Sequence, residues 1–79
     1  MVWRVVEHDD RRWNVSIAAE RRANSPQWNL VFSFRPADLG QRSFWAIYPL
    51  SSTSRSALFA QAAQIPDDAI AALIAEHLQ

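Results

Sequence analysis

The sequence predicts an α+β domain, in which a four-stranded antiparallel β-meander is followed by two C-terminal α-helices packed on one face of the sheet. Up to Pro49, aromatic and β-branched residues alternate with polar ones, which is the period of half-buried strands. After Pro49, alanine-rich segments repeat at the three- and four-residue spacing of amphipathic helices. Short connections between the expected strands favour antiparallel pairing in sequence order. With 79 residues, we expect a single compact domain spanning 1–79.

Four segments carry the strand pattern. The expected strands cover residues 3–7, 12–19, 28–35 and 43–48. The polar residues 8–11 predict a turn between the first two strands, and Asn24-Ser25-Pro26 predicts another before the third. Pro49 is expected to close the fourth strand, because proline has no N–H to donate to a ladder.

Two helices are expected after the sheet. Residues 51–54 are serines and a threonine, which favour helix N-caps, so the first helix is expected over about 54–64. Pro66 suits the first turn of a second helix, and Asp67 and Asp68 complement the positive end of its dipole. This second helix is expected to run to about Leu78.

The alternation assigns each side chain to one face of the sheet. The expected inner face consists of Trp3, Val5, Trp13, Val15, Ile17, Trp28, Leu30, Phe32 and Phe34, which should meet Leu58, Ile70, Leu73 and Ile74 of the helices. The expected outer, solvated face consists of Arg4, Asn14, Ser16, Asn29, Ser33 and Arg35.

Composition argues against several classes of protein. Without cysteine, the chain has neither disulfides nor thiolate metal sites, and no run approaches the roughly 18 apolar residues that cross a bilayer. The first ten residues carry charges where a signal peptide needs an apolar core, so we expect a cytoplasmic protein. Every basic residue is arginine and there are thirteen alanines, which is typical of a GC-rich genome and suggests a bacterial or phage origin.

No catalytic or metal-binding constellation is visible. His8-Asp9-Asp10 is better explained as a hairpin turn, and His77 lies far from it near the end of the last expected helix. The serines of 51–56 are better explained as helix caps than as nucleophiles, because no base is positioned by their spacing. We therefore expect no enzyme activity, no cofactor and no metal.

The strongest functional signal is the fourth expected strand, which is apolar on both faces. Trp45 and Ile47 lie on the face opposite to Phe44, Ala46 and Tyr48, and Val31 of the neighbouring strand extends their surface. An edge strand with exposed aromatics is a liability unless something covers it. This pattern predicts a protein-binding surface or a homodimer contact made by Val31, Trp45 and Ile47, with Arg35 and Arg42 as its polar rim. Alternatively, the loop around Leu39 or the chain after Tyr48 covers the patch.

A second hypothesis is nucleic-acid binding at the end of the sheet where the first and third connections meet. Arg11, Arg12, Arg35 and Arg42 are expected to converge there, with Trp45 near enough to stack a base. Asp9, Asp10 and Asp38 occupy the same end and would offset this positive charge, and the net charge of the chain is zero. Contact with a protein is therefore favoured over contact with a nucleic acid.

Overall fold

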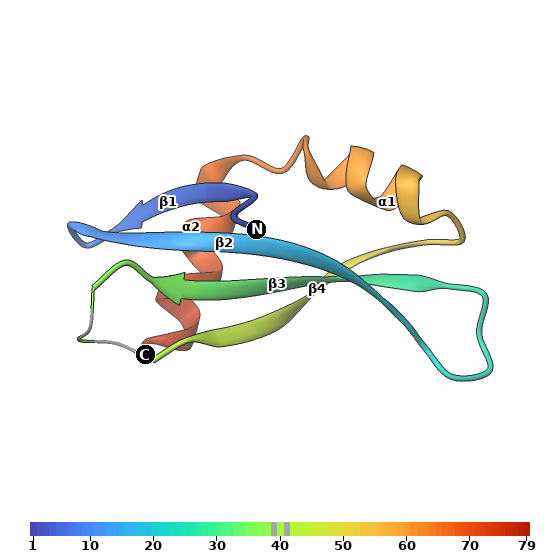
Figure 1. Cartoon of the computed structure of the whole chain (residues 1–79), viewed down its shortest axis with the longest axis horizontal. Coiled ribbons are helices and arrows are strands. Elements are labelled where there is room, and N and C mark those ends of the chain that lie inside the picture. The colour runs from blue at the N-terminus through green and yellow to red at the C-terminus, as the bar shows by residue number, and fades with distance from the viewer. Residues whose placement is uncertain (39, 41) are drawn as a thin grey trace.

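The computed structural model of this chain describes residues 1–38, 40 and 42–79. Its elements are β1 (Arg4–His8), β2 (Arg11–Arg21), β3 (Trp28–Pro36), β4 (Phe44–Ser52), α1 (Arg55–Ala62) and α2 (Asp67–His77). The strands form one antiparallel sheet in the order β1-β2-β3-β4, and the two helices pack against it (Figure 1). The predicted α+β meander with two C-terminal helices is confirmed.

The β1–β2 hairpin is closed by Asp9 and Asp10, which both adopt positive φ angles of 51° and 61°. Two consecutive left-handed residues form the kind of two-residue turn whose twist matches that of paired strands. This turn pairs His8 with Arg11 and therefore Val6 with Trp13. Directly paired residues share a face, so the turn decides which side of β1 is buried.

The face assigned to β1 from the sequence is wrong. Val6 is only 2% exposed and belongs to the core, whereas Val5 is 47% exposed on the opposite face. Arg4, expected on the outer face, pairs with the buried Val15 and lies on the helix side. There its guanidinium donates to the carbonyl oxygen of Ile65, and Nη1 lies 3.1 Å from Oδ1 of Asp67.

The fourth strand is longer than predicted, because Pro49 does not end it. Tyr48 pairs with Leu30, but the next pair joins Ser51 to Asn29, so Pro49 and Leu50 fall in a pairing irregularity. Proline is tolerated at such a bulge because the ladder there does not need its missing N–H. The regular part of β4 facing β3 is therefore Phe44 to Tyr48.

The helices begin where their caps predict. The Ser54 hydroxyl accepts a hydrogen bond from the Ala57 N–H at 3.2 Å, and α1 follows at Arg55. Pro66 is extended and precedes α2, whose first turn contains Asp67 and Asp68. Both helices are slightly shorter than their expected ranges.

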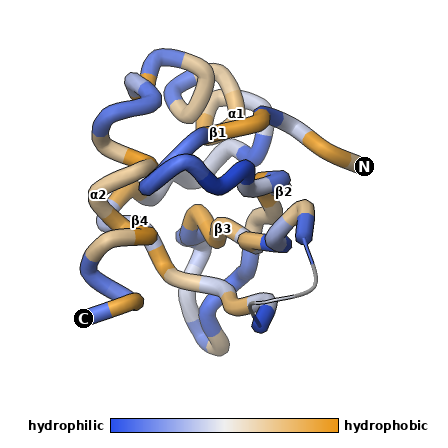
Figure 2. The backbone as a smooth tube through the Cα atoms, turned by 90° about the vertical axis from the view of Figure 1, so that its left-hand side faces the viewer, coloured by the Kyte–Doolittle hydropathy of each residue, from blue (hydrophilic) through white to orange (hydrophobic). Residues whose placement is uncertain are grey.

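The core lies between the sheet and the helices. It consists of Val6, Trp13, Val15, Leu30, Phe32, Phe34, Leu58, Ala62, Ile65, Ile70 and Ile74. Trp3, Ile17 and Trp28 of the predicted inner face pack against it half-buried, and so does Leu73 of α2, which was expected to meet that face. Figure 2 shows α2 on one side of the sheet and the N-terminal residues on the other.

Candidate functional site

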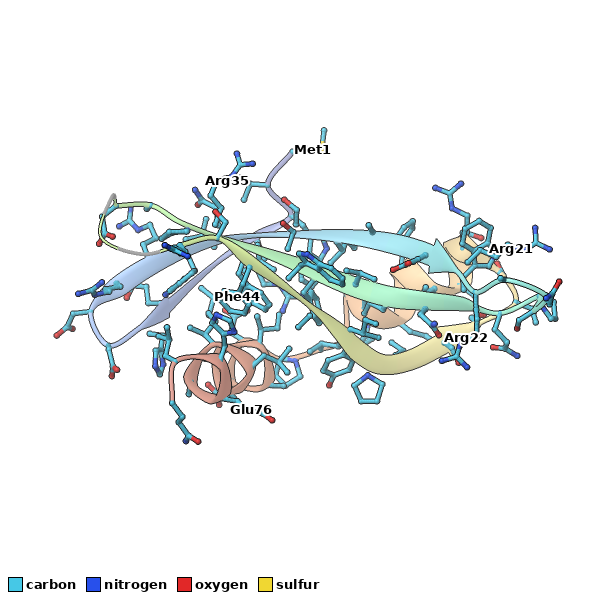
Figure 3. All side chains as sticks on the ribbon, turned by 90° about the horizontal axis from the view of Figure 1, so that it is seen from below. Met1, Arg21, Arg22, Arg35, Phe44 and Glu76 are labelled. Atoms are coloured by element: carbon cyan, nitrogen blue, oxygen red, sulfur yellow. The ribbon has the colours of Figure 1, made fainter. Side chains whose placement is uncertain are left out.

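The face of the sheet opposite to the helices is left largely open. The N-terminal residues lie against it, since the Ser16 hydroxyl donates a hydrogen bond of 2.7 Å to the Met1 carbonyl oxygen. Met1 and Arg35 lie on this side of the ribbon in Figure 3, whereas Phe44 points toward α2, which carries Glu76. Met1 and Val2 are exposed and add apolar surface that the sequence analysis did not include.

The predicted contact residues meet on this open face. The strand register aligns Ala18, Val31 and Ile47 in one row and Ser16, Ser33 and Trp45 in the next. Trp45 is 67% exposed and Ile47 58% exposed, while Val31 is half-buried between its neighbours. Val31, Trp45 and Ile47 thus form one surface, which we call the β4 patch.

One of the two coverings considered from the sequence does not occur. The chain after Tyr48 continues along β4 to Ser52 and does not bury Trp45 or Ile47. The other covering involved Leu39, which lies outside the described residues.

The edge of β4 also borders a groove that the sequence analysis missed. This groove of about 500 Å³ is lined by Phe44, Trp45, Ala46, Ile47, Tyr48 and Pro49 of β4 and by Leu73, Glu76 and His77 of α2. At one end, the His77 ring stacks on Phe44 with centroids 3.7 Å apart and planes 6° from parallel. Leu73 and His77 are four residues apart on α2 and so share a face, a spacing visible in the sequence. Their position against β4 depends on how α2 crosses the sheet, which the spacing does not specify.

Of the four described strands, β4 alone carries no charged side chain. It is also an edge strand, with β3 as its one hydrogen-bonded neighbour in the sheet. Alternate backbone N–H and C=O groups of such a strand point away from the sheet and are available to another strand. The β4 patch and the groove share Trp45 and Ile47 and meet along this edge.

The four arginines named from the sequence do not form a single cluster. Arg11 and Arg12 border a hollow with the acidic residues Glu7, Asp10 and Asp38. The Ala37 N–H donates to the Arg12 carbonyl oxygen at 2.9 Å, which ties the two connections together.

Arg35 belongs to a different hollow on the open face, shared with Met1, Val2 and Asn14. Arg42 is exposed and lies just before β4. Arg35 thus lies on the open face in β3, and Arg42 precedes Phe44, the first residue of β4.

A second group of arginines lies at the opposite end of the sheet. The guanidinium carbons of Arg21 and Arg55 lie 5.9 Å and 5.2 Å from the centroid of Trp28, within the range of a cation–π contact. Figure 3 shows Arg21 and Arg22 at the end of the molecule far from Arg35. Arg55 comes from α1, so its place beside Arg21 depends on how α1 packs and could not be read from the strand pattern.

Among the described residues, few titratable side chains lie close enough together to form a catalytic or metal-binding site. His8 pairs with Asp9 inside the β1–β2 turn, at 3.3 Å between Nε2 and Oδ2. Among residues 1–38, 40 and 42–79, no three histidine, aspartate or glutamate side chains gather as metal ligands. In the same residues, no helix has the length and apolar character needed to cross a membrane.

Comparisons with known proteins identify no relative: no family model matches the chain, and neither a curated protein nor a solved structure matches it.

Proposed function

We propose that this chain is a non-enzymatic interaction domain that binds a protein through the β4 patch. The observation that carries the proposal is the exposure of Trp45 and Ile47 on an uncharged edge strand. Burying apolar surface stabilises a contact by roughly 25 cal/mol per Å², and a tryptophan offers more such surface than any other side chain.

The surroundings of the patch resemble those of known contact surfaces. Apolar and aromatic groups lie at the centre, and Arg35 and Arg42 supply a polar rim. Tryptophan and arginine are the residues most enriched among energetically dominant contact positions. Val31 is half-buried beside Ile47, in the row next to that of Trp45, and extends the apolar surface onto β3.

The test is to compare Trp45→Ala with Val5→Ala, since Val5 is an exposed apolar residue on the opposite edge strand. Both variants should keep the circular dichroism spectrum of the wild type. Sedimentation equilibrium over a concentration series, with capture of host proteins in parallel, should show that Trp45→Ala loses binding and Val5→Ala keeps it. If Trp45→Ala binds its partner as the wild type does, the β4 patch is not the contact surface.

Nucleic-acid binding is the second candidate. The observation in its favour is that no ion pair involves Arg11, Arg12, Arg35 or Arg42 within the described residues. Against it stand the acidic side chains around Arg11 and Arg12.

Salt separates the two functions. Binding to phosphates weakens steeply as salt rises, because bound counterions are released, whereas an apolar contact hardly responds. A single-stranded oligonucleotide that bound at low salt and was lost at high salt, with Arg12→Gln weakening it and Trp45→Ala not, would favour the nucleic-acid function.

A further inference from the structure

We infer that the free edge of β4 pairs antiparallel with β4 of a second copy of this chain, so that two sheets join into one. The inference rests on the proposed function and names the partner and the geometry of the contact. It concerns the backbone edge and the register, whereas the proposed function concerns only the exposed side chains of the β4 patch.

The edge is suited to strand addition. β4 spans Phe44–Ser52 and has a neighbour on one side only. Proteins protect such edges with charged side chains, prolines, β-bulges, short strands or covering elements, and in β4 the proline and the bulge come only after Tyr48. The described β4 has no charge, and its exposed Trp45 and Ile47 leave the open side of the edge uncovered.

The register follows from where the strand is regular. The regular ladder with β3 covers Phe44 to Tyr48, and Pro49 after it has no N–H to donate. An antiparallel pair of identical strands is related by a two-fold axis, and the middle residue of the regular part is Ala46. With the two-fold axis at Ala46, all the residues from Phe44 to Tyr48 of one copy pair with the same segment of the other copy.

This register is self-complementary. Trp45 faces Ile47 of the second copy, and Phe44 faces Tyr48 of the second copy. Aromatic–β-branched and aromatic–aromatic pairs across strands each contribute roughly 0.2–1 kcal/mol. By symmetry each pair occurs twice, and the two β4 patches become continuous on the open face.

Charge favours a second copy over another edge. A strand with charged side chains beside β4 would bury those charges against apolar groups, at a cost in free energy. Of the described strands, only β4 has no charged side chain, so a second β4 avoids this cost. The net charge of zero also means that two copies do not repel each other.

The rival geometry is a dimer in which two open faces stack. That arrangement would also bury Trp45 and Ile47, so variants of these residues do not separate the two. Ala46 and Ala18 do. Ala46 borders the groove beside the β4 edge, whereas Ala18 is exposed on the open face of the central strand β2.

The experiment uses single cysteines, which the chain allows because it has none of its own. Ala46→Cys and Ala18→Cys are prepared as a matched pair and treated with a short thiol-to-thiol crosslinker at concentrations where sedimentation shows self-association. Directly opposed residues of paired strands have Cβ atoms about 5 Å apart. We expect a covalent dimer from Ala46→Cys and none from Ala18→Cys.

A variant that does not depend on crosslinking completes the test. Ile47→Lys changes an exposed side chain, so folding should persist, but it places a charge beside the proposed axis. The dimer dissociation constant should rise by at least about tenfold, with little effect of salt on the wild-type dimer.

Three outcomes would overturn the inference. Crosslinking through Ala18→Cys alone would indicate stacked faces, and crosslinking through both would indicate unspecific association. A wild-type chain that stays monomeric at all concentrations would also exclude a second copy. In that last case the proposed function still holds if another protein binds in a way that depends on Trp45.

Discussion

The two edges of the sheet are built in opposite ways. β1 is five residues long and carries Arg4, Glu7 and His8, and its Arg4 side chain is tied to Ile65 and Asp67 beside α2. The regular part of β4, Phe44 to Tyr48, is no longer than β1, but β4 carries no charge and exposes Trp45 and Ile47. Charged edges resist pairing with other chains, whereas uncharged apolar edges invite it. Under the proposed function, β1 is the protected edge of the sheet and β4 is the edge that binds.

The largest effect is expected from truncating Val6, the residue of β1 that is buried in the core. Val6→Ala should lower the free energy of unfolding by about 2 kcal/mol, because it removes two buried carbons and leaves a cavity. The matched Val5→Ala, on the exposed face, should change it by less than about 0.5 kcal/mol. Urea unfolding of both variants measures the difference. Equal effects would contradict the assigned face of β1.

The next largest effect is expected on self-association, when a charge is placed on one or the other edge strand. Ile47→Lys should weaken self-association at least about tenfold, or about 1.4 kcal/mol. Val5→Lys introduces the same charge at an exposed position of the other edge strand and should leave association unchanged. Sedimentation equilibrium of both variants at one salt concentration makes the comparison. A Val5→Lys variant that dissociated as readily would show that β4 has no special role.

A smaller effect is expected when Arg4 of β1 loses its contacts with Ile65 and Asp67. Arg4→Met keeps the aliphatic stem but removes the donors to the Ile65 carbonyl and the Asp67 carboxylate. The loss should be about 1 kcal/mol of unfolding free energy, since both partners can turn to water. Light scattering should also show species larger than those of the wild type. Unchanged scattering would mean that the charge of Arg4 does not guard this edge.

The smallest effect should come from the turn that holds β1. Asp10→Gly replaces a residue at a φ of 61° with one that adopts positive φ without steric cost. A stabilisation of about 0.5 kcal/mol is expected, with unchanged self-association. Thermal unfolding followed by circular dichroism detects it, and a destabilised variant would indicate that the Asp10 side chain contributes more than its backbone.

Much of the fold could be predicted because its signals are local. Strict alternation in residues 12–19 and 28–35 identified β2 and β3, and the serines before Arg55 located the start of α1. β1 was assigned to the wrong face because Val5 and Val6 are both apolar and the strand is short. The two-residue turn held the missing information, since it pairs His8 with Arg11 and Val6 with Trp13.

The site could be predicted only in part. Alternation alone placed Trp45 and Ile47 opposite to Phe44, and the register with β3 brought Val31 beside them. The groove beside β4 needed the position of α2, and the Arg55–Trp28 contact needed the position of α1. The extension of β4 beyond Pro49 needed a bulge, which the sequence does not signal. These features depend on packing between distant segments.

The ion pair between Arg4 and Asp67 bears on the size of the assembly that the proposed β4 contact would form. Pairing β4 with β4 leaves a β1 strand at each outer end of the joined sheet. If β1 also paired with β1 of another dimer, dimers would add edge to edge without limit and form fibres. In the proposed dimer, the Arg4 guanidinium held beside β1 would discourage a further strand at each end, so the assembly would not grow beyond two copies.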